Sequence, residues 1–175
     1  MNNVILSLGR NCEPREYLKK AYNLSKKNGY NSSPFDLCIT SINALYKTLE
    51  TNFNDFFEGL KIVPWENAEG DRSKAGPGLT CITNENGIIF NHEGSGHSHL
   101  FSEGTNQDDF YTRNNYKEFK KRYTNRISNF KNYCKYAKTI TFIHNHKIID
   151  EALIKNIITN KYGKKTIKFI SLAKN

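Results

Sequence analysis

The N-terminal region contains an apolar run, a glycine and a cysteine within nine residues, since positions 4–12 read VILSLGRNC. A short apolar run that stops at a glycine is typical of a buried β-strand, here residues 4–8. Pro14 follows Cys12 by two positions, and proline is tolerated in the first turn of a helix because the N–H group that it lacks would have no helical partner there. The sequence therefore predicts a strand, a tight turn and a helix that begins near Asn11 or Cys12.

The thiol of Cys12 would lie at the N-terminus of this predicted helix. Unpaired N–H groups and the helix dipole stabilise a thiolate there, and the thiolate is the nucleophilic form of cysteine. The N–H groups of the preceding turn, at Gly9, Arg10 and Asn11, would then be placed to bind a negatively charged oxygen or the substrate. The alternative is that Cys12 is a small apolar residue that closes the first helical turn. Position alone gives the two interpretations equal weight.

The remainder of the chain alternates between helical and strand-like patterns. Thr40 or Ser41 can cap a helix, and an Asn-Gly pair predicts a β-hairpin with its turn at residues 83–87. Other segments are predicted as helices at 52–57, 117–138 and 149–161, and as strands at 60–63, 79–82, 88–90, 139–143 and 166–170. We expect one domain over residues 1–175, of the α/β (or α+β) class, with a central mixed sheet, flanking helices and the hairpin.

Basic residues outnumber acidic ones by 26 to 17, which gives a net charge of +9. Eight basic residues and one acid lie in the segment 117–138. The excess is explained either by a nucleic acid or another anionic partner, or by the composition of an A/T-rich genome, which we favour. Apolar side chains recur in this segment at helical spacing, so the basic residues should form the solvated face of an amphipathic helix. These apolar residues are Phe119, Tyr123, Ile127, Phe130 and Cys134.

Hydropathy and cysteine spacing predict where the chain resides. No stretch approaches the roughly 18 apolar residues that span a membrane, and the N-terminus lacks the basic and apolar segments of a signal peptide. We therefore expect a cytoplasmic protein that binds no membrane. The four cysteines form no CxxC pair and are expected to be free thiols in a reducing compartment. They are Cys12, Cys38, Cys81 and Cys134.

A cysteine nucleophile needs a base, and His92 is the best placed of the five histidines because it follows the end of a predicted strand. His97 and His99 lie beyond a glycine-rich segment. With His92 or Cys81 they would chelate zinc if a strand placed them on one face. We favour the interpretation without a metal, and we expect no cofactor.

A third group would orient the imidazole of His92. Asn145, Asp150 and Asp36 are the candidates, and among them we favour Asn145 and Asp36. The chain order of cysteine, histidine and asparagine matches that of papain-type enzymes. Asp36 has an alternative structural role, because it can cap the helix that follows it.

Five short motifs span most of the chain: SLGRNC at 7–12, SPFD at 33–36, the pair Phe53 and Phe56, FNHE at 90–93 and FI at 142–143. Together they resemble a family of bacterial and viral proteins described as papain-like cysteine peptidases. The resemblance implies Cys12 as nucleophile and His92 as base. Leu37 stands where the family usually has tryptophan, and Glu93 stands where aspartate is commoner.

The sequence thus favours an enzyme, a cysteine hydrolase that acts on an amide, thioester or isopeptide bond in a peptide or other acyl substrate. The loops at 65–77 and 94–104 would border its cleft. Two alternatives stay open. One is a non-catalytic module that binds nucleic acid or another anionic partner through the basic helix 117–138. The other keeps Cys12 as nucleophile but in an esterase or glycan-modifying enzyme.

Overall fold

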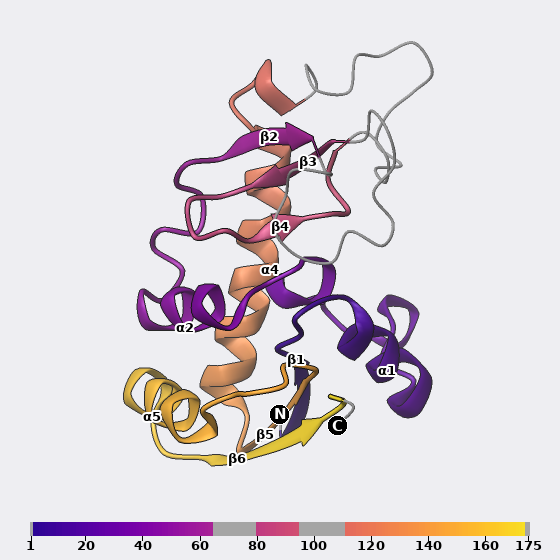
Figure 1. Cartoon of the computed structure of the whole chain (residues 1–175). Helices are drawn as coiled ribbons and strands as arrows, with labels where there is room; N and C mark the ends of the chain where they lie inside the picture. Colours follow the sequence, from indigo (N-terminus) through magenta and orange to yellow (C-terminus); the bar gives the residue numbers. More distant parts are fainter. Residues whose placement is uncertain (1, 65–79, 95–110, 174–175) are drawn as a thin grey trace.

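The structure, a computed structural model of the 175-residue chain, describes residues 2–64, 80–94 and 111–173. It contains two three-stranded sheets, one parallel and one antiparallel, and the helices that pack on them (Figure 1). The chain is thus a mixed α/β protein, as predicted. The strand and helix bounds, in chain order, are β1 Asn3–Ser7, α1 Glu13–Tyr22, η1 Lys26–Asn28, η2 Pro34–Leu37, α2 Ile42–Glu50, β2 Lys61–Pro64, β3 Thr80–Thr83, β4 Ile89–Phe90, α4 Lys117–Tyr136, β5 Thr139–His144, α5 Glu151–Tyr162 and β6 Thr166–Ser171.

The parallel sheet has the strand order β1-β5-β6, so the first strand of the chain pairs with strands from its C-terminal third. Alternate residues of β1 face opposite sides of this sheet. Leu6 packs with Phe142 in the main apolar cluster, whereas Ile5 packs with Ile143 and Leu18 in a smaller cluster beneath α1. Both faces are therefore covered, which is why β1 is a nearly continuous apolar run.

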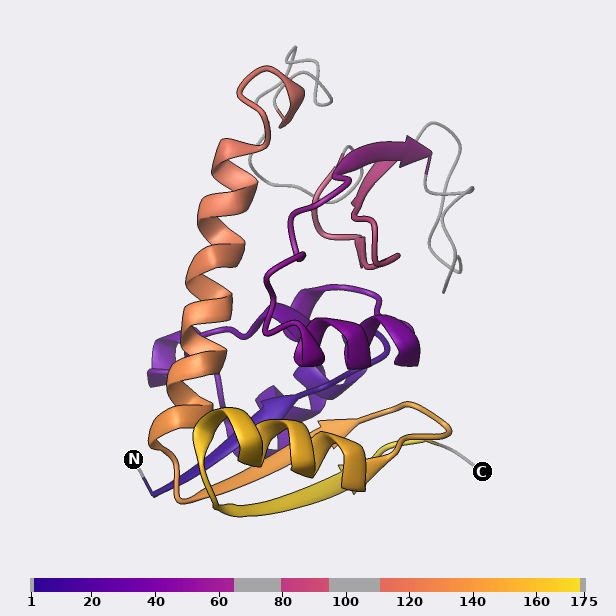
Figure 2. The same cartoon turned by 90° about the vertical axis from the view of Figure 1, so that its left-hand side faces the viewer.

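The long helix α4 runs past both sheets in the two views of the molecule (Figures 1 and 2). Its buried residues include all five apolar positions that define the helical pattern of this segment. The prediction of an amphipathic helix here is therefore confirmed. Among the described residues, none of the helices combines the length and the apolar character needed to cross a bilayer.

The antiparallel sheet has the order β2-β3-β4 and includes the predicted hairpin. The expectation of one central mixed sheet is wrong, because the described strands divide into two separate sheets. The cause is connectivity. Strands β2 to β4 follow one another and pair among themselves, whereas β5 and β6 are joined through α5 and align parallel to β1.

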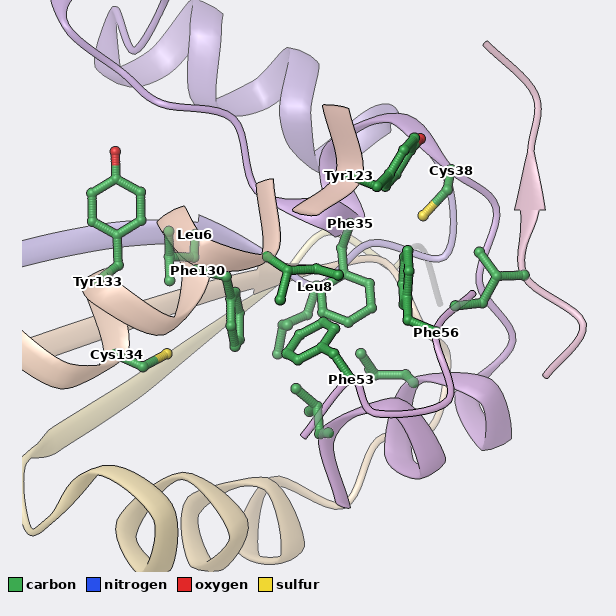
Figure 3. Close-up of a cluster of buried hydrophobic side chains, with 14 of the residues drawn as sticks. Leu6, Leu8, Phe35, Cys38, Phe53, Phe56, Tyr123, Phe130, Tyr133 and Cys134 are labelled. Atoms are coloured by element: carbon green, nitrogen blue, oxygen red, sulfur yellow. The ribbon is translucent and has the colours of Figure 1, made fainter. Parts of the chain in front are cut away.

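A cluster of aromatic rings fills the space between the two sheets (Figure 3). The ring centroid of Phe53 lies 5.4 Å from that of Phe130, 5.8 Å from that of Phe35 and 5.9 Å from that of Phe56. The segment 52–57 consists of hydrogen-bonded turns rather than the predicted short helix. The positive φ angles of Asn52 and Phe53 prevent a regular helix here. The side chains of Phe53 and Phe56 are nevertheless buried in the core.

One short segment connects the two sheets directly. Thr40 N–H donates to the carbonyl oxygen of Arg10, in the turn after β1, at 2.9 Å. The neighbouring Ile39 forms a pair of backbone hydrogen bonds with Ile89 of β4, at 2.8 and 2.9 Å. The turn after β1 and strand β4 are thereby held at a fixed separation. The α2 helix begins immediately afterwards with Ser41 as its cap, as predicted.

Candidate active site

The structure brings Cys12 and His92 together. Cys12 is the N-cap residue of α1, and His92 lies in the turn that follows β4. The distance between Cys12 Sγ and His92 Nε2 is 3.1 Å, and both residues are partly exposed. A thiol and an imidazole at this distance can exchange a proton.

The turn that carries Cys12 depends on Gly9. A Cβ atom at this position would overlap the carbonyl oxygen of Asn11 and the ring of Pro14, so only glycine allows the chain to fold this closely. The side chain of Asn11 then gives the first N–H group of α1 a partner, because its Oδ1 accepts a hydrogen bond from Glu13 N–H at 3.0 Å. The Cys12 side chain is thus fixed at the first turn of the helix, as the sequence predicts.

Asn145 holds this turn from the neighbouring strand. Its Oδ1 accepts from Arg10 N–H at 2.8 Å, and its Nδ2 donates to Asn11 Oδ1 at 2.7 Å and to Glu13 Oε2 at 2.9 Å. The contact follows from topology, because β1 and β5 are parallel neighbours and their carboxyl ends meet at one edge of the sheet. These hydrogen bonds place Asn145 against the turn that carries the thiol.

Two of the three turn N–H groups predicted to bind an oxyanion already have partners within the protein. Gly9 N–H donates to Ser7 Oγ at 3.2 Å, and Arg10 N–H donates to Asn145 Oδ1. The prediction is wrong for these two groups, because each N–H already donates a hydrogen bond to a side chain at or just after the end of a strand. A side-chain amide also lies close to the sulfur: Asn91 Nδ2 is 3.9 Å from Cys12 Sγ.

Asn91 is a site residue that sequence reasoning missed, although it directly precedes His92. Its Oδ1 is buried and accepts no hydrogen bond from the described residues. Its Nδ2 faces the thiol, where a carbonyl oxygen of a substrate bonded to sulfur would also lie. The carboxamide is therefore a candidate donor to that oxygen.

Glu93, the residue after His92, is also a site residue whose role the sequence does not reveal. Its buried carboxylate accepts from Tyr111 Oη at 2.9 Å and from Arg122 Nε at 3.2 Å, and it forms a salt bridge with Arg122 Nη2. Arg122 belongs to α4, so this ion pair fastens the His92 turn to the long helix. Gly94 completes the turn at φ +128°, and a Cβ atom there would overlap the carbonyl oxygen of Thr80.

Asp36 lies in η2 and is fully buried. Its carboxylate accepts from Ser33 N–H at 2.9 Å and from Tyr30 Oη at 3.1 Å, and Arg15 Nε lies 3.9 Å away. Burial raises the pKa of Asp36, whereas the contacts with Ser33 and Arg15 oppose this rise. These contacts match the structural alternative for Asp36, a capping box, although it closes η2 rather than the next helix.

The three other cysteines are buried and differ from Cys12 in this respect. Burial raises the pKa of Cys38 and of Cys134 to about 12 and that of Cys81 to about 11. Figure 3 shows Cys38 and Cys134 among the apolar side chains of the core. Of the four thiols, Cys12 is therefore the one that solvent and a substrate can reach.

The other histidines are not partners of Cys12 in the described part of the chain. Burial lowers the pKa of His144 and lowers that of His146 to about 4, so both are neutral at pH 7. His97 and His99 lie outside the described residues, as do the loop at 65–77 and most of the loop at 94–104. The proposed zinc alternative and the predicted cleft borders thus fall on segments without structural description.

The protein is thus an α/β protein with a cysteine at a helix N-terminus and a histidine imidazole in contact with it. The model of the family described as "Putative papain-like cysteine peptidase" matches residues 3–166, and the chain belongs to this family. The resemblance noted from the sequence motifs is thereby confirmed. Neither the comparison with curated proteins nor the comparison with solved structures gave a match.

Proposed function

We propose that the protein is a cysteine hydrolase that cleaves an acyl bond of a peptide or a related thioester. The distance of 3.1 Å between Cys12 Sγ and His92 Nε2 carries this proposal. His92 takes the thiol proton as Cys12 Sγ bonds to the acyl carbon, and then gives it to the leaving amine or thiol as the acyl bond breaks. Water, deprotonated by His92, then hydrolyses the Cys12 thioester and regenerates the thiol.

Three further features support this chemistry. The first-turn N–H groups and the dipole of α1 favour a thiolate on Cys12. The carboxamide of Asn91 is close enough to donate to the oxyanion that forms on the acyl carbon. The Glu93–Arg122 ion pair fixes the turn that carries His92, and the hydrogen bonds of Asn145 fix the turn that carries Cys12. Cys12 and His92 therefore require little rearrangement to react.

Labelling with an electrophilic thiol probe, read by intact mass, tests the nucleophile. The wild-type protein should take up one equivalent of iodoacetamide rapidly, and Cys12→Ala should abolish this fast phase. The matched control is Cys134→Ala, which removes a buried thiol and should leave the fast phase unchanged. Equal labelling rates for all four cysteines would contradict the proposal.

Turnover of an amide, a thioester and an ester of the same acyl group tests the reaction. We expect hydrolysis of at least the thioester by the wild-type protein and none by Cys12→Ala. Cys12→Ser should retain the fold but lose most of the activity, because a hydroxyl is far harder to deprotonate than a thiol. Hydrolysis that persists in Cys12→Ala would assign the reaction to another residue.

A further inference from the structure

A second cavity lies between α4 and the segment 26–32, and neither Cys12 nor His92 lines it. Its volume is about 370 Å³. Its lining includes three cationic side chains and several hydrogen-bonding ones, but no carboxylate among the described residues. Those that matter here are Lys26, Arg122, Arg126, Ser32, Asn125 and Asn129.

Two of the three cations form no salt bridge with a carboxylate of the described residues. Arg122 is neutralised by its salt bridge with Glu93. Within the described part of the chain, Lys26 and Arg126 have no carboxylate oxygen within 4.0 Å. Among the described residues, the lining therefore carries a net positive charge, and the nearest carboxylates that act on Arg126, those of Glu93 and Asp36, lie outside the lining.

Arg126 is held in place and still has hydrogen-bonding capacity. Its guanidinium group lies 4.5 Å from the ring centroid of Tyr123. Its Nη1 atom is buried and donates no hydrogen bond to the described residues. A buried guanidinium donor without a partner is costly, and a small rotation of the guanidinium toward an oxyanion in the cavity would satisfy it.

We propose that this cavity binds a small molecule that carries a phosphate group. Guanidinium groups match the geometry of phosphate oxygens, and the carboxamide of Asn125 can donate to the rest of the ligand. Asn129 Nδ2 already donates to the carbonyl oxygen of Ser32 at 3.0 Å, which leaves it one further N–H. A cavity of this volume accommodates a small organic phosphate. The site does not depend on hydrolysis at Cys12, because neither Cys12 nor His92 lines it, although Arg122 also pairs with Glu93 beside the His92 turn. This proposal assigns ligand binding to the two arginines of α4 that line the cavity, rather than to the whole basic face of the helix.

The test is a titration of the full chain with phenyl phosphate at constant ionic strength, followed by calorimetry. The wild-type protein should bind one equivalent with a dissociation constant of about 1 mM or lower. Asn125→Asp places a carboxylate at the exposed rim of the cavity and should weaken binding by about tenfold. The matched control is Asn132→Asp, the same change at an exposed position of α4 outside the cavity, and it should weaken binding less than about twofold.

A second pair of variants removes charge instead of adding it. Lys26→Gln should weaken binding about threefold, whereas Lys27→Gln, its exposed neighbour outside the lining, should have little effect. Equal affinities of wild type and Asn125→Asp would overturn the proposal. So would a single-stranded oligonucleotide that binds tightly and loses as much affinity through Asn132→Asp as through Asn125→Asp, because the whole surface of α4 would then bind polyanions.

Discussion

The ion pair between Glu93 and Arg122 leads to a prediction for Glu93→Gln. The glutamine retains the size of the side chain and an oxygen that accepts from Tyr111, but it removes the negative charge. Loss of one partner from a buried ion pair costs about 3–5 kcal/mol. Here the Glu93 side chain is 5% exposed but that of Arg122 is 27% exposed, so the guanidinium can turn toward water. We therefore expect the free energy of unfolding to fall by about 2 kcal/mol.

The same substitution should slow the chemistry at Cys12 while the protein is still folded. The Glu93 carboxylate fastens the His92 turn to α4, and a displacement of about 1 Å in such a group can cost about 100-fold in rate. We expect the alkylation rate of Cys12 at pH 6 to fall by at least about tenfold. Glu58→Gln, which removes the same charge from an exposed position, is the matched control and should change neither quantity.

Urea unfolding and intact-mass kinetics measure the two effects separately. The double variant Glu93→Gln with Arg122→Gln should be more stable than Glu93→Gln alone, because it leaves no unpaired guanidinium beside the His92 turn. A stability loss below about 0.5 kcal/mol together with an unchanged alkylation rate would refute this role of Glu93.

Three other residues give further predictions. Asn145→Ala removes the hydrogen bonds to Arg10 N–H and to the start of α1, and it should lower stability by about 2 kcal/mol in urea. It should slow Cys12 alkylation equally at pH 6 and pH 9, and a loss confined to low pH would instead assign Asn145 to the imidazole. Gly94→Ala should cost about 3 kcal/mol in urea, against about 1 kcal/mol for Gly87→Ala, because only the first places Cβ against a carbonyl oxygen. Burial lowers the pKa of His146 from 6.5 to about 4, so the unfolded state takes up a proton first as pH falls. Stability should drop by about 2.5 kcal/mol between pH 7.5 and 4.5 through this group, and His146→Gln should reduce the drop, whereas identical pH profiles would contradict it.

Local patterns predicted the elements of this fold better than their pairing. The spacing of Phe119 and Tyr123 reports one helix face, and the apolar run at 4–8 reports a strand, because both signals come from neighbouring residues. Which strands share a sheet depends on contacts across more than 100 residues, such as Leu6 with Phe142. The sequence carries no local signal for these contacts, so the two sheets were expected as one.

In the candidate site, too, local patterns predicted individual residues but not their long-range contacts. Cys12 was predicted from the strand, turn and proline around it, and His92 from its place at a strand end. Asn145 was predicted to orient the imidazole of His92, whereas its described hydrogen bonds go to the Cys12 turn, a contact that depends on β1 and β5 being neighbours. Arg122 lies on the helix face expected to be solvated, so its ion pair with Glu93 could not be predicted from spacing.

The pairing of Cys12 with His92 is tested most directly by the alkylation rate of Cys12 in the wild-type protein and in His92→Asn, measured at pH 6 and at pH 9. An ordinary thiol with a pKa of about 8.5 is less than about 1% ionised at pH 6, so fast alkylation there requires that His92 or the start of α1 stabilise the thiolate, and His92→Asn separates the two. We predict that His92→Asn slows the reaction by about 100-fold at pH 6 and only a few-fold at pH 9. Equal rates for the two proteins at pH 6 would contradict the account.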